Sequence, residues 1–480
     1  MKKFKKVMAL SLALAMGASL VACGGNSEST GDATEATEAA KTEEAEPEKE
    51  ADEETAKAEA DLSSDGKVLN IQCWNDEFAR RLAAHYPGYE ANDPDDALKG
   101  GKIGDIEVKF TMTPSTDNAY QNNLDAVLPG NADAAEDDRV DMFLADVDYA
   151  LKYFNSDISV PVADLGIADS ELTAQYKHTK DFATDVNGNL KGLSWQACPG
   201  VLIYNREAAK EILGSDDPET VQAAVADWDT YNETAKKVVE AGYKMTATAN
   251  DTYRVFADNV SSPWVVDGKI VVDDNIKNWA ETSKEQVDAK ITGTGNLWGE
   301  EWTAGFFPEG KVFCYFGPAW LIDFCMSEKD SASIAAQGGW GATTGPQSFA
   351  WGGTYIIAAA GTDNPALVAD IMRKLTVDTD IMTEIVKQDN DFVNNKPAME
   401  AMAQDSSYGD AILGGQNALD IFCTSAENID KSNVSEYDQG CTESFQKAMK
   451  DYFEGNTATY EEALEAFYKS VTEKYPELTY

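Results

Sequence analysis

The sequence predicts an α/β fold built on a parallel sheet, because strand-like and helix-like segments alternate where its foldable part begins. Residues 67–74 (KVLNIQCW) are a short apolar run rich in branched side chains, which is typical of a buried strand. Residues 75–86 (NDEFARRLAAHY) carry apolar side chains at helical spacing, and residues 105–113 (DIEVKFTMT) alternate like a second strand. A strand, a helix and a strand in this order predict a βαβ unit with parallel strands.

Further segments of both kinds follow along the chain. Residues 118–128 (NAYQNNLDAVL) predict a helix, and residues 140–146 (VDMFLAD) predict a third strand. The Asn187-Gly188 pair predicts the turn of a hairpin. The later segments are 200–213 (strand into helix), 310–324 (strand, glycine turn, helix), 349–360 (strand), and amphipathic helices over 365–386 and 459–475.

The N-terminus has the layout of a secretory signal. Four lysines precede an apolar run that ends in small residues, and this run is too short for a comfortable membrane span of about 20 residues. Leu20-Val21-Ala22-Cys23 resembles the lipobox of bacterial lipoproteins, in which the cysteine receives a diacylglycerol and becomes the first residue. We therefore expect residues 1–22 to be removed and Cys23 to be a lipid anchor. The alternative is an ordinary signal cut near Ala22, with Cys23 incidental.

The segment after this cysteine predicts a stalk. Residues 24–66 hold 15 acidic and 3 basic residues, no aromatic residue and one large aliphatic residue, Leu62. Such a segment cannot bury enough apolar surface to fold, and its like charges extend it. We expect residues 23–66 to be a disordered acidic tether.

Charge restricts the partners of the remaining chain. The net charge of −45 leaves −37 on residues 67–480 once the signal lysines and the stalk are subtracted. A surface this negative repels nucleic acid and anionic lipid headgroups, so contact with a membrane is expected through the lipid anchor only. A neutral or cationic small molecule fits better than a strongly anionic ligand.

Cysteine and histidine usage gives no sign of metal or cofactor chemistry. Six cysteines follow Cys23, which allows up to three disulfides, but several lie in apolar runs where free buried thiols are expected. The two histidines, His85 and His178, lie far apart in the sequence. We expect no metal site and no cofactor.

Candidate binding residues follow the predicted strands. Ligands of open α/β sheets bind beyond the carboxyl ends of the strands. Here those ends carry Trp74-Asn75-Asp76, residues 113–118, and Asp146-Val147-Asp148.

Five segments in fixed order carry a family resemblance. They are KVLNIQCWNDEF (67–78), MFLADVDYALKY (142–153), NLKGLSWQACPGVLIYNREA (189–208), EGKVFCYFGPAWL (309–321) and WGGTYIIAA (351–359). The set resembles the extracellular solute-binding proteins (family 1 type) of carbohydrate ABC transporters, in particular lipoproteins of the Firmicutes type, over nearly all of residues 67–480.

The resemblance implies a two-lobed, periplasmic-binding-protein-like (Venus flytrap) fold with a ligand cleft between the lobes. Lobe one would comprise residues 67–185 plus 340–395, and lobe two residues 186–339 plus 396–480. It also implies a monomer on the extracellular face of the cell membrane. This monomer would bind an oligosaccharide and deliver it to the permease subunits of an ABC transporter, without catalysis.

The same resemblance suggests which residues hold the sugar. Flat aromatic rings suit the C–H faces of a pyranose, and carboxylates and amides suit its hydroxyl groups. Tyr120, Gln121 and Tyr204 are weaker choices. The candidates carried over by position are Trp74, Asn75, Asp76, Asn118, Asp146, Trp195, Trp264, Trp320, Trp351 and Gly352.

Three other classes of protein stay open at this point, and one of them, a sensor partner for a histidine kinase, cannot be separated from a transport protein by sequence. A peptide-binding or amino-acid-binding protein would need a positive group for the ligand carboxylate. No arginine stands among the strand-end residues named above, and Arg206 and Arg254 are the candidates that remain. A surface glycoside hydrolase needs only a carboxylate pair, which 84 acidic residues could supply without being informative. The sequence shows no nucleophile elbow, zinc-protease motif or phosphate-binding glycine loop.

Overall fold

The computed structural model describes residues 65–326 and 330–480. The predicted signal peptide, Cys23 and nearly all of the predicted stalk lie outside these ranges. The residues in these two ranges belong to one compact unit. Within the described ranges, no helix is both long enough and apolar enough to span a bilayer.

The first sheet contains the predicted βαβ unit. Its seven strands lie in the order β2-β3-β4-β1-β5-β13-β6. β1 pairs in parallel with β4 and β5, and β13 joins the other edge of β5 antiparallel. We call the elements around this sheet the first lobe. Its strands are β1 (Val68–Cys73), β2 (Tyr89–Ala91), β3 (Gly101–Ile103), β4 (Ile106–Met112), β5 (Val140–Asp146), β6 (Leu193–Ser194) and β13 (Thr354–Ala358).

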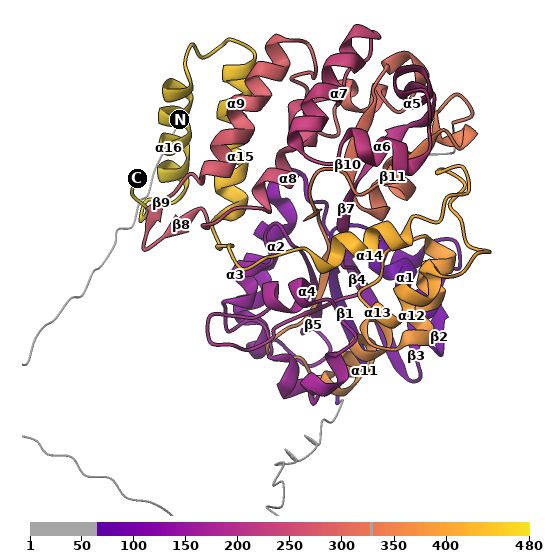
Figure 1. The fold of residues 1–480 in the computed structure, drawn as a ribbon. Coiled ribbons are helices and arrows are strands. Elements are labelled where there is room, and N and C mark those ends of the chain that lie inside the picture. The colour runs from indigo at the N-terminus through magenta and orange to yellow at the C-terminus, as the bar shows by residue number, and fades with distance from the viewer. Residues whose placement is uncertain (1–64, 327–329) are drawn as a thin grey trace, which may run out of the picture. The chain divides into compact units, whose positions relative to one another are not determined.

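The second sheet is smaller and is built around one buried strand. β7 (Pro199–Asn205) pairs antiparallel with β10 (Cys314–Gly317), β11 (Trp340–Thr343) and β12 (Phe349–Ala350). We call the elements around this sheet the second lobe. In Figure 1, β1, β4 and β5 lie together, apart from β7, β10 and β11.

The chain crosses between the sheets at two segments that carry functional candidates. The first crossing is residues 195–198, between β6 and β7, and the second is residues 351–353, between β12 and β13. Both lie later than the predicted lobe boundaries at 185/186 and 339/340, because β6 pairs with the first sheet and β11 with the second. The hairpin at Asn187-Gly188 is only a turn within the first lobe, closed by backbone amides that donate to Asp185 Oδ1.

Three other predicted elements are split or shortened in the structure. The strand predicted over 349–360 is two short strands in different sheets, with residues 351–353 between them. The helix predicted over 365–386 is two helices, because the Asp378 side chain accepts from the Ile381 amide and starts a new one. After the predicted glycine turn at Gly317, the chain forms only a short π-helical turn (Leu321–Cys325).

The helices cover the sheets and form a third layer at one end. The α9, α15 and α16 helices lie side by side (Figure 1) around a separate apolar cluster. The helices are α1 (Glu77–His85), α2 (Ala119–Val127), α3 (Leu151–Phe154), α4 (Lys177–Phe182), α5 (Arg206–Leu213), α6 (Pro218–Ala224), α7 (Trp228–Glu240), α8 (Tyr253–Ala257), α9 (Asp274–Asp288), α10 (Glu300–Ala304), α11 (Pro365–Thr376), α12 (Thr379–Asp389), α13 (Lys396–Ala403), α14 (Leu419–Glu427), α15 (Asp438–Phe453) and α16 (Tyr460–Lys474). A short hairpin joins β8 (Val265–Val266) and β9 (Lys269–Ile270).

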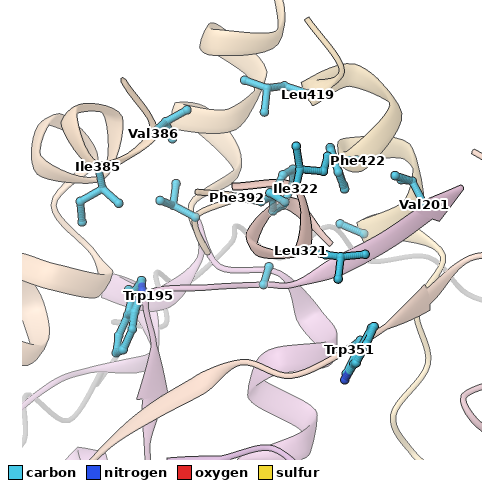
Figure 2. Close-up of a cluster of buried hydrophobic side chains, with 14 of the residues drawn as sticks. Trp195, Val201, Leu321, Ile322, Trp351, Ile385, Val386, Phe392, Leu419 and Phe422 are labelled. Atoms are coloured by element: carbon cyan, nitrogen blue, oxygen red, sulfur yellow. The ribbon is translucent and has the colours of Figure 1, made fainter. Parts of the chain in front are cut away.

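The largest apolar cluster is continuous between the two lobes. It contains side chains of both sheets together with residues of α12, α13 and α14. Figure 2 shows part of it, with Trp195 on the first crossing and Trp351 on the second. The two crossing segments are therefore anchored in a shared core, and the cavity described next opens beside them.

Candidate ligand-binding site

A cavity of about 740 Å³ lies between the two lobes. The first lobe contributes the residues after β1 and β5 and the facing ends of α1 and α12. The second lobe contributes Arg254, Leu297 and Trp298, and the residues after β10. The crossing segments contribute Gln196 and residues 351–353. Its volume falls within the range of roughly 300–1,000 Å³ that is usual for small-molecule sites.

Three tryptophans form one wall of this cavity. The rings of Trp320 and Trp351 meet edge to face at 5.0 Å, and Trp298 lies parallel to Trp320 at 6.1 Å. The indole N–H of Trp320 donates to the Trp351 carbonyl oxygen at 3.0 Å. This hydrogen bond and the ring contacts fix the orientation of the wall.

Two glycines on the second crossing make this arrangement possible. Gly352 has φ +72° and Gly353 has φ +120°, backbone conformations that side chains rarely adopt. A Cβ at Gly352 would also lie 3.5 Å from the Trp320 ring. The glycines therefore let the chain turn between the sheets while Trp351 stays against Trp320.

The first lobe's wall of the cavity comes from the ends of β1 and β5. Trp74 follows β1 and contacts Tyr120 and Tyr149, at 5.5 Å and 6.2 Å between ring centroids. Asp146 ends β5 and accepts from the Asp148 amide at 2.9 Å. Parallel strands bring these ends to one edge of the sheet, as the sequence predicts.

One ion pair joins the lobes at the edge of the cavity. Arg254 on α8 donates to both carboxylate oxygens of Asp148, at 2.5 Å and 2.7 Å. Its guanidinium also lies 5.8 Å from the Trp351 ring centroid. Burial alone would raise the pKa of Asp148, but this guanidinium lowers it.

The floor near α1 is a buried polar network. Gln196 on the first crossing donates to Glu77 and to Asp391, each at 2.9 Å. Arg81 pairs with Asp391 at 2.8 Å and also with Asp389. Burial, then the charge of Asp391, raises the pKa of Glu77 to about 7.

Asp146 is a further carboxyl group of the cavity whose surroundings favour its protonated form. Burial, and next the negative charge of Asp148, raises its pKa to about 7. The nearby Arg254 lowers it less, since that guanidinium is committed to Asp148. The cavity as a whole offers apolar ring faces and hydrogen-bonding carboxylates to a bound molecule. Among the described residues that line this cavity, no nucleophile is activated by a neighbouring base.

Comparison with known proteins identifies the family. The model for bacterial extracellular solute-binding proteins matches residues 98–411, more than half of the chain. The chain belongs to this family. No curated protein matches it in sequence.

Solved structures share the fold of this solute-binding protein. A protein described as extracellular solute-binding protein family 1 superposes with TM-score 0.68 at 17% identity, covering 84% of this chain and 99% of its own. A binding protein from B. animalis subsp. lactis in complex with β-1,6-galactobiose has TM-score 0.61 at 17% identity, covering 86% and 99%. The lacto-N-biose-binding protein from Bifidobacterium longum has TM-score 0.63 at 14% identity, covering 86% and 99%.

These matches confirm the predicted two-lobed α/β fold of periplasmic sugar-binding proteins. The family and these structural neighbours are binding proteins rather than enzymes.

Most of the predicted site residues line the cavity of this solute-binding protein. They are Trp74, Asn75, Asp76, Asp146, Trp320, Trp351 and Gly352. The other three predicted residues lie elsewhere in the described structure.

Those three lie in different surroundings. Trp195 is 1% exposed and packs on Phe78 at 5.7 Å, because its position on the first crossing points it into the shared core. Trp264 packs on aromatic rings of α15 and α16 and lines a separate cavity of about 190 Å³. Asn118 occupies the N-cap position of α2 in a left-handed conformation, and its side-chain oxygen accepts from Gln439.

The cavity also contains residues that the sequence reasoning did not select. Trp298 is 55% exposed, and Phe324 on the π-helical turn is 73% exposed. Trp298 lies in the loop GTGNLWGE, where three nearby glycines were the available signal for a loop tryptophan. Arg81 and residues 388–391 had no such signal, since only the packing of α12 against α1 brings them to the cavity.

Proposed function

We propose that this protein is a lipid-anchored extracellular receptor that captures an oligosaccharide and delivers it to the permease subunits of an ABC transporter. The observation that carries the proposal is the cavity between the lobes, which both a tryptophan wall and several carboxylates line. Two of the structural neighbours are complexes with a disaccharide. The proposal extends that ligand class to this chain.

The cavity residues divide by the part of the sugar that they suit. Trp320 and Trp351, supported by Trp298, offer ring faces to the C–H surface of a pyranose. Trp74 offers a second aromatic surface from the first lobe. Asn75, Asp76 and Asp146 supply hydrogen-bond acceptors for hydroxyl groups.

Capture and release would use the motion of the lobes. The chain crosses between the sheets at residues 195–198 and 351–353, and such short segments are where hinge closure is absorbed. Because Trp351 and Gln196 lie on these segments and line the cavity, ligand contact and lobe position are coupled there. The cycle is binding and release, with no covalent step.

The ion pairs in the cavity do not favour a peptide or amino-acid ligand. Recognition of a ligand carboxylate needs a cation that is available to it. Arg81 and Arg254 are both engaged by carboxylates of the protein, and Arg206 donates to backbone carbonyls of the second lobe.

The experiment that tests the proposal is thermal unfolding of residues 57–480 with panels of oligosaccharides, amino acids and peptides. A ligand at about 100 times its dissociation constant stabilises the folded state by roughly 2.7 kcal/mol. We expect one class of oligosaccharide to raise the melting temperature and to be recovered intact afterwards. A shift with peptides alone, or cleavage of the sugar, would contradict the proposal.

The anchor is tested separately on the full chain. We expect Cys23→Ser to move the protein from the membrane fraction to the medium without changing its melting temperature. An unchanged membrane fraction would show that something other than Cys23 holds it. Binding to the permease is tested by co-purification of the transporter with the anchored wild-type protein.

A further inference from the structure

The cavity is lined by more carboxyl groups than guanidinium groups, and the guanidinium groups are less available to a ligand. Seven carboxyl groups and three guanidinium groups line it: Asp76, Glu77, Asp146, Asp148, Asp323, Asp389 and Asp391, with Arg80, Arg81 and Arg254. Their formal sum is −4 when all are ionised. The whole chain is acidic as well, so the cavity has no compensating positive surroundings.

Each of the three arginines is already paired with a carboxylate. Arg80 pairs with Asp76 at 3.2 Å. Arg81 is held by the carboxylates around α12, and Arg254 makes the bidentate pair with Asp148. A ligand carboxylate that entered the cavity would therefore have to displace one of these pairs.

Unlike the three arginines, Asp146 has no ion-pair partner of opposite charge among the described residues, although its carboxyl group can still accept hydrogen bonds. The hydrogen bond described for its side chain comes from the Asp148 amide, and no ion pair within the described ranges includes it. Its neighbour Asp148 repels it and holds Arg254. A positive group on the ligand would supply the counter-charge that the protein does not.

The aromatic wall favours the same kind of group. The faces of indole rings attract cations, with tryptophan the strongest of the aromatic residues. Trp320, Trp351 and Trp74 line the same cavity as Asp146. An ammonium group in this cavity would meet both kinds of favourable surface.

We infer that the cavity selects its sugar by charge, preferring an oligosaccharide that bears a protonated amino group over its neutral counterpart and rejecting the corresponding acidic sugar. This inference rests on the proposed function, since it names the chemistry of the sugar that the same site takes. Neutral sugars are still bound through their hydroxyl groups, and the order of affinity is amine, neutral, acid.

The test is a matched series of oligosaccharides, titrated calorimetrically into residues 57–480. The first series consists of β-1,4-linked trimers of glucosamine, glucose and glucuronic acid, which differ chiefly in charge. The second series consists of the amine, neutral and acid forms of whichever oligosaccharide gives the largest thermal shift. We expect roughly tenfold tighter binding of the amine than of the neutral sugar, about the difference between a charge-assisted and a neutral hydrogen bond. We expect no measurable binding of the acid.

Two variants assign this preference to the site. Asp146→Asn is expected to bring the amine and the neutral sugar to within about twofold of each other, since it removes the unpaired charge. Asp288→Asn is the matched control, because Asp288 lies on α9 outside the cavity and pairs with Lys284. The control is expected to keep the preference of the wild type. Binding of the acidic sugar as tightly as the neutral one would overturn the inference and leave the proposed function intact.

A second measurement needs no sugar and distinguishes the two failures. Trp298 is the exposed tryptophan among the described residues, so its fluorescence reports the potential at the cavity. Quenching by caesium and by iodide is compared with quenching of free N-acetyltryptophanamide, and Trp298→Phe identifies the signal. We expect caesium to be favoured and iodide to be excluded. If no sugar binds, the proposed function is wrong. If iodide also quenches Trp298 as well as it quenches the free tryptophan compound, the inference about charge is wrong too.

Discussion

Trp320 and Trp351 are the residues on which the proposed site depends most. Trp351 is 7% exposed and Trp320 is half-buried, so each is packed on one side and open to the cavity on the other. The sequence could select them because a glycine turn at Gly317 precedes Trp320 and a glycine pair follows Trp351. Trp195 and Trp264 have the same residue type without that context, and the structure places them in apolar clusters.

Trp320→Ala is expected to weaken oligosaccharide binding by about tenfold or more. The reason is the loss of ring contact, worth about 0.5–1.5 kcal/mol for an aromatic pair beyond the area buried. Isothermal titration calorimetry measures the change. Trp264→Phe is the control, since Trp264 lies outside the cavity, and equal losses in the two variants would contradict the assignment.

Gly353→Ala is expected to lower the free energy of unfolding by about 1–3 kcal/mol, the usual cost of a side chain in a conformation reserved for glycine. Its φ of +120° is the physical reason. Gly130→Ala is the matched control, because nothing lies within 4 Å of a Cβ built there and its φ is not positive. Urea denaturation of both variants checks the prediction, and equal stabilities would contradict it.

At the scale of elements, the sequence predicted what local patterns determine. The strands β1, β4, β5 and β7 and the helices α1, α2 and α5 appear close to their predicted ranges, since burial periodicity and caps such as Asn205 are encoded locally. The crossings were placed too early because pairing decides them, and β6 is a strand of two residues. The contribution of residues 388–391 to the cavity depends on long-range packing, which a single sequence does not reveal.

The pair between β5 and α8 is expected to stabilise the approach of the lobes. In Arg254→Met, Asp148 loses its counter-charge beside Asp146, so the contact between the lobes is weakened. A double-mutant cycle with Asp148→Asn is expected to give a coupling energy of about 1–2 kcal/mol, moderate because the pair is partly exposed. Small-angle scattering is expected to show a larger radius of gyration for Arg254→Met without ligand. A coupling energy of zero together with an unchanged radius of gyration would show that this ion pair does not stabilise the contact between the lobes.

At the scale of the whole molecule, composition predicts the net negative charge, but it does not predict which of the acidic residues are buried. Glu77, Asp146 and Asp251 are carboxyl groups whose pKa is raised to about 7, in each case first of all by burial. Two of them line the cavity, and Asp251 accepts from the Trp302 indole within the second lobe. We therefore expect the site and the stability of the fold both to respond to pH near neutrality.

Stability is expected to fall as pH rises from about 5 to 8. In the unfolded chain these three carboxyl groups release their protons near pH 4, so at intermediate pH the folded state holds the extra protons. His178 acts in the opposite direction, because burial lowers its pKa to about 4. It is outnumbered, since burial also raises the pKa of Asp141 and of Asp438 to about 6. Melting temperatures across this range check the prediction, with a shallower slope expected for Asp251→Asn. A melting temperature that rises with pH would contradict it.

The central claim is that an oligosaccharide binds between the lobes against the tryptophan wall. The most direct measurement is a crystal structure of residues 57–480 with the sugar that gives the largest thermal shift. We predict an intact sugar with one ring on Trp320 and Trp351 and a hydroxyl or amino group on Asp146. A sugar bound outside the 740 Å³ cavity, or beside Trp264 in the smaller one, would contradict the account.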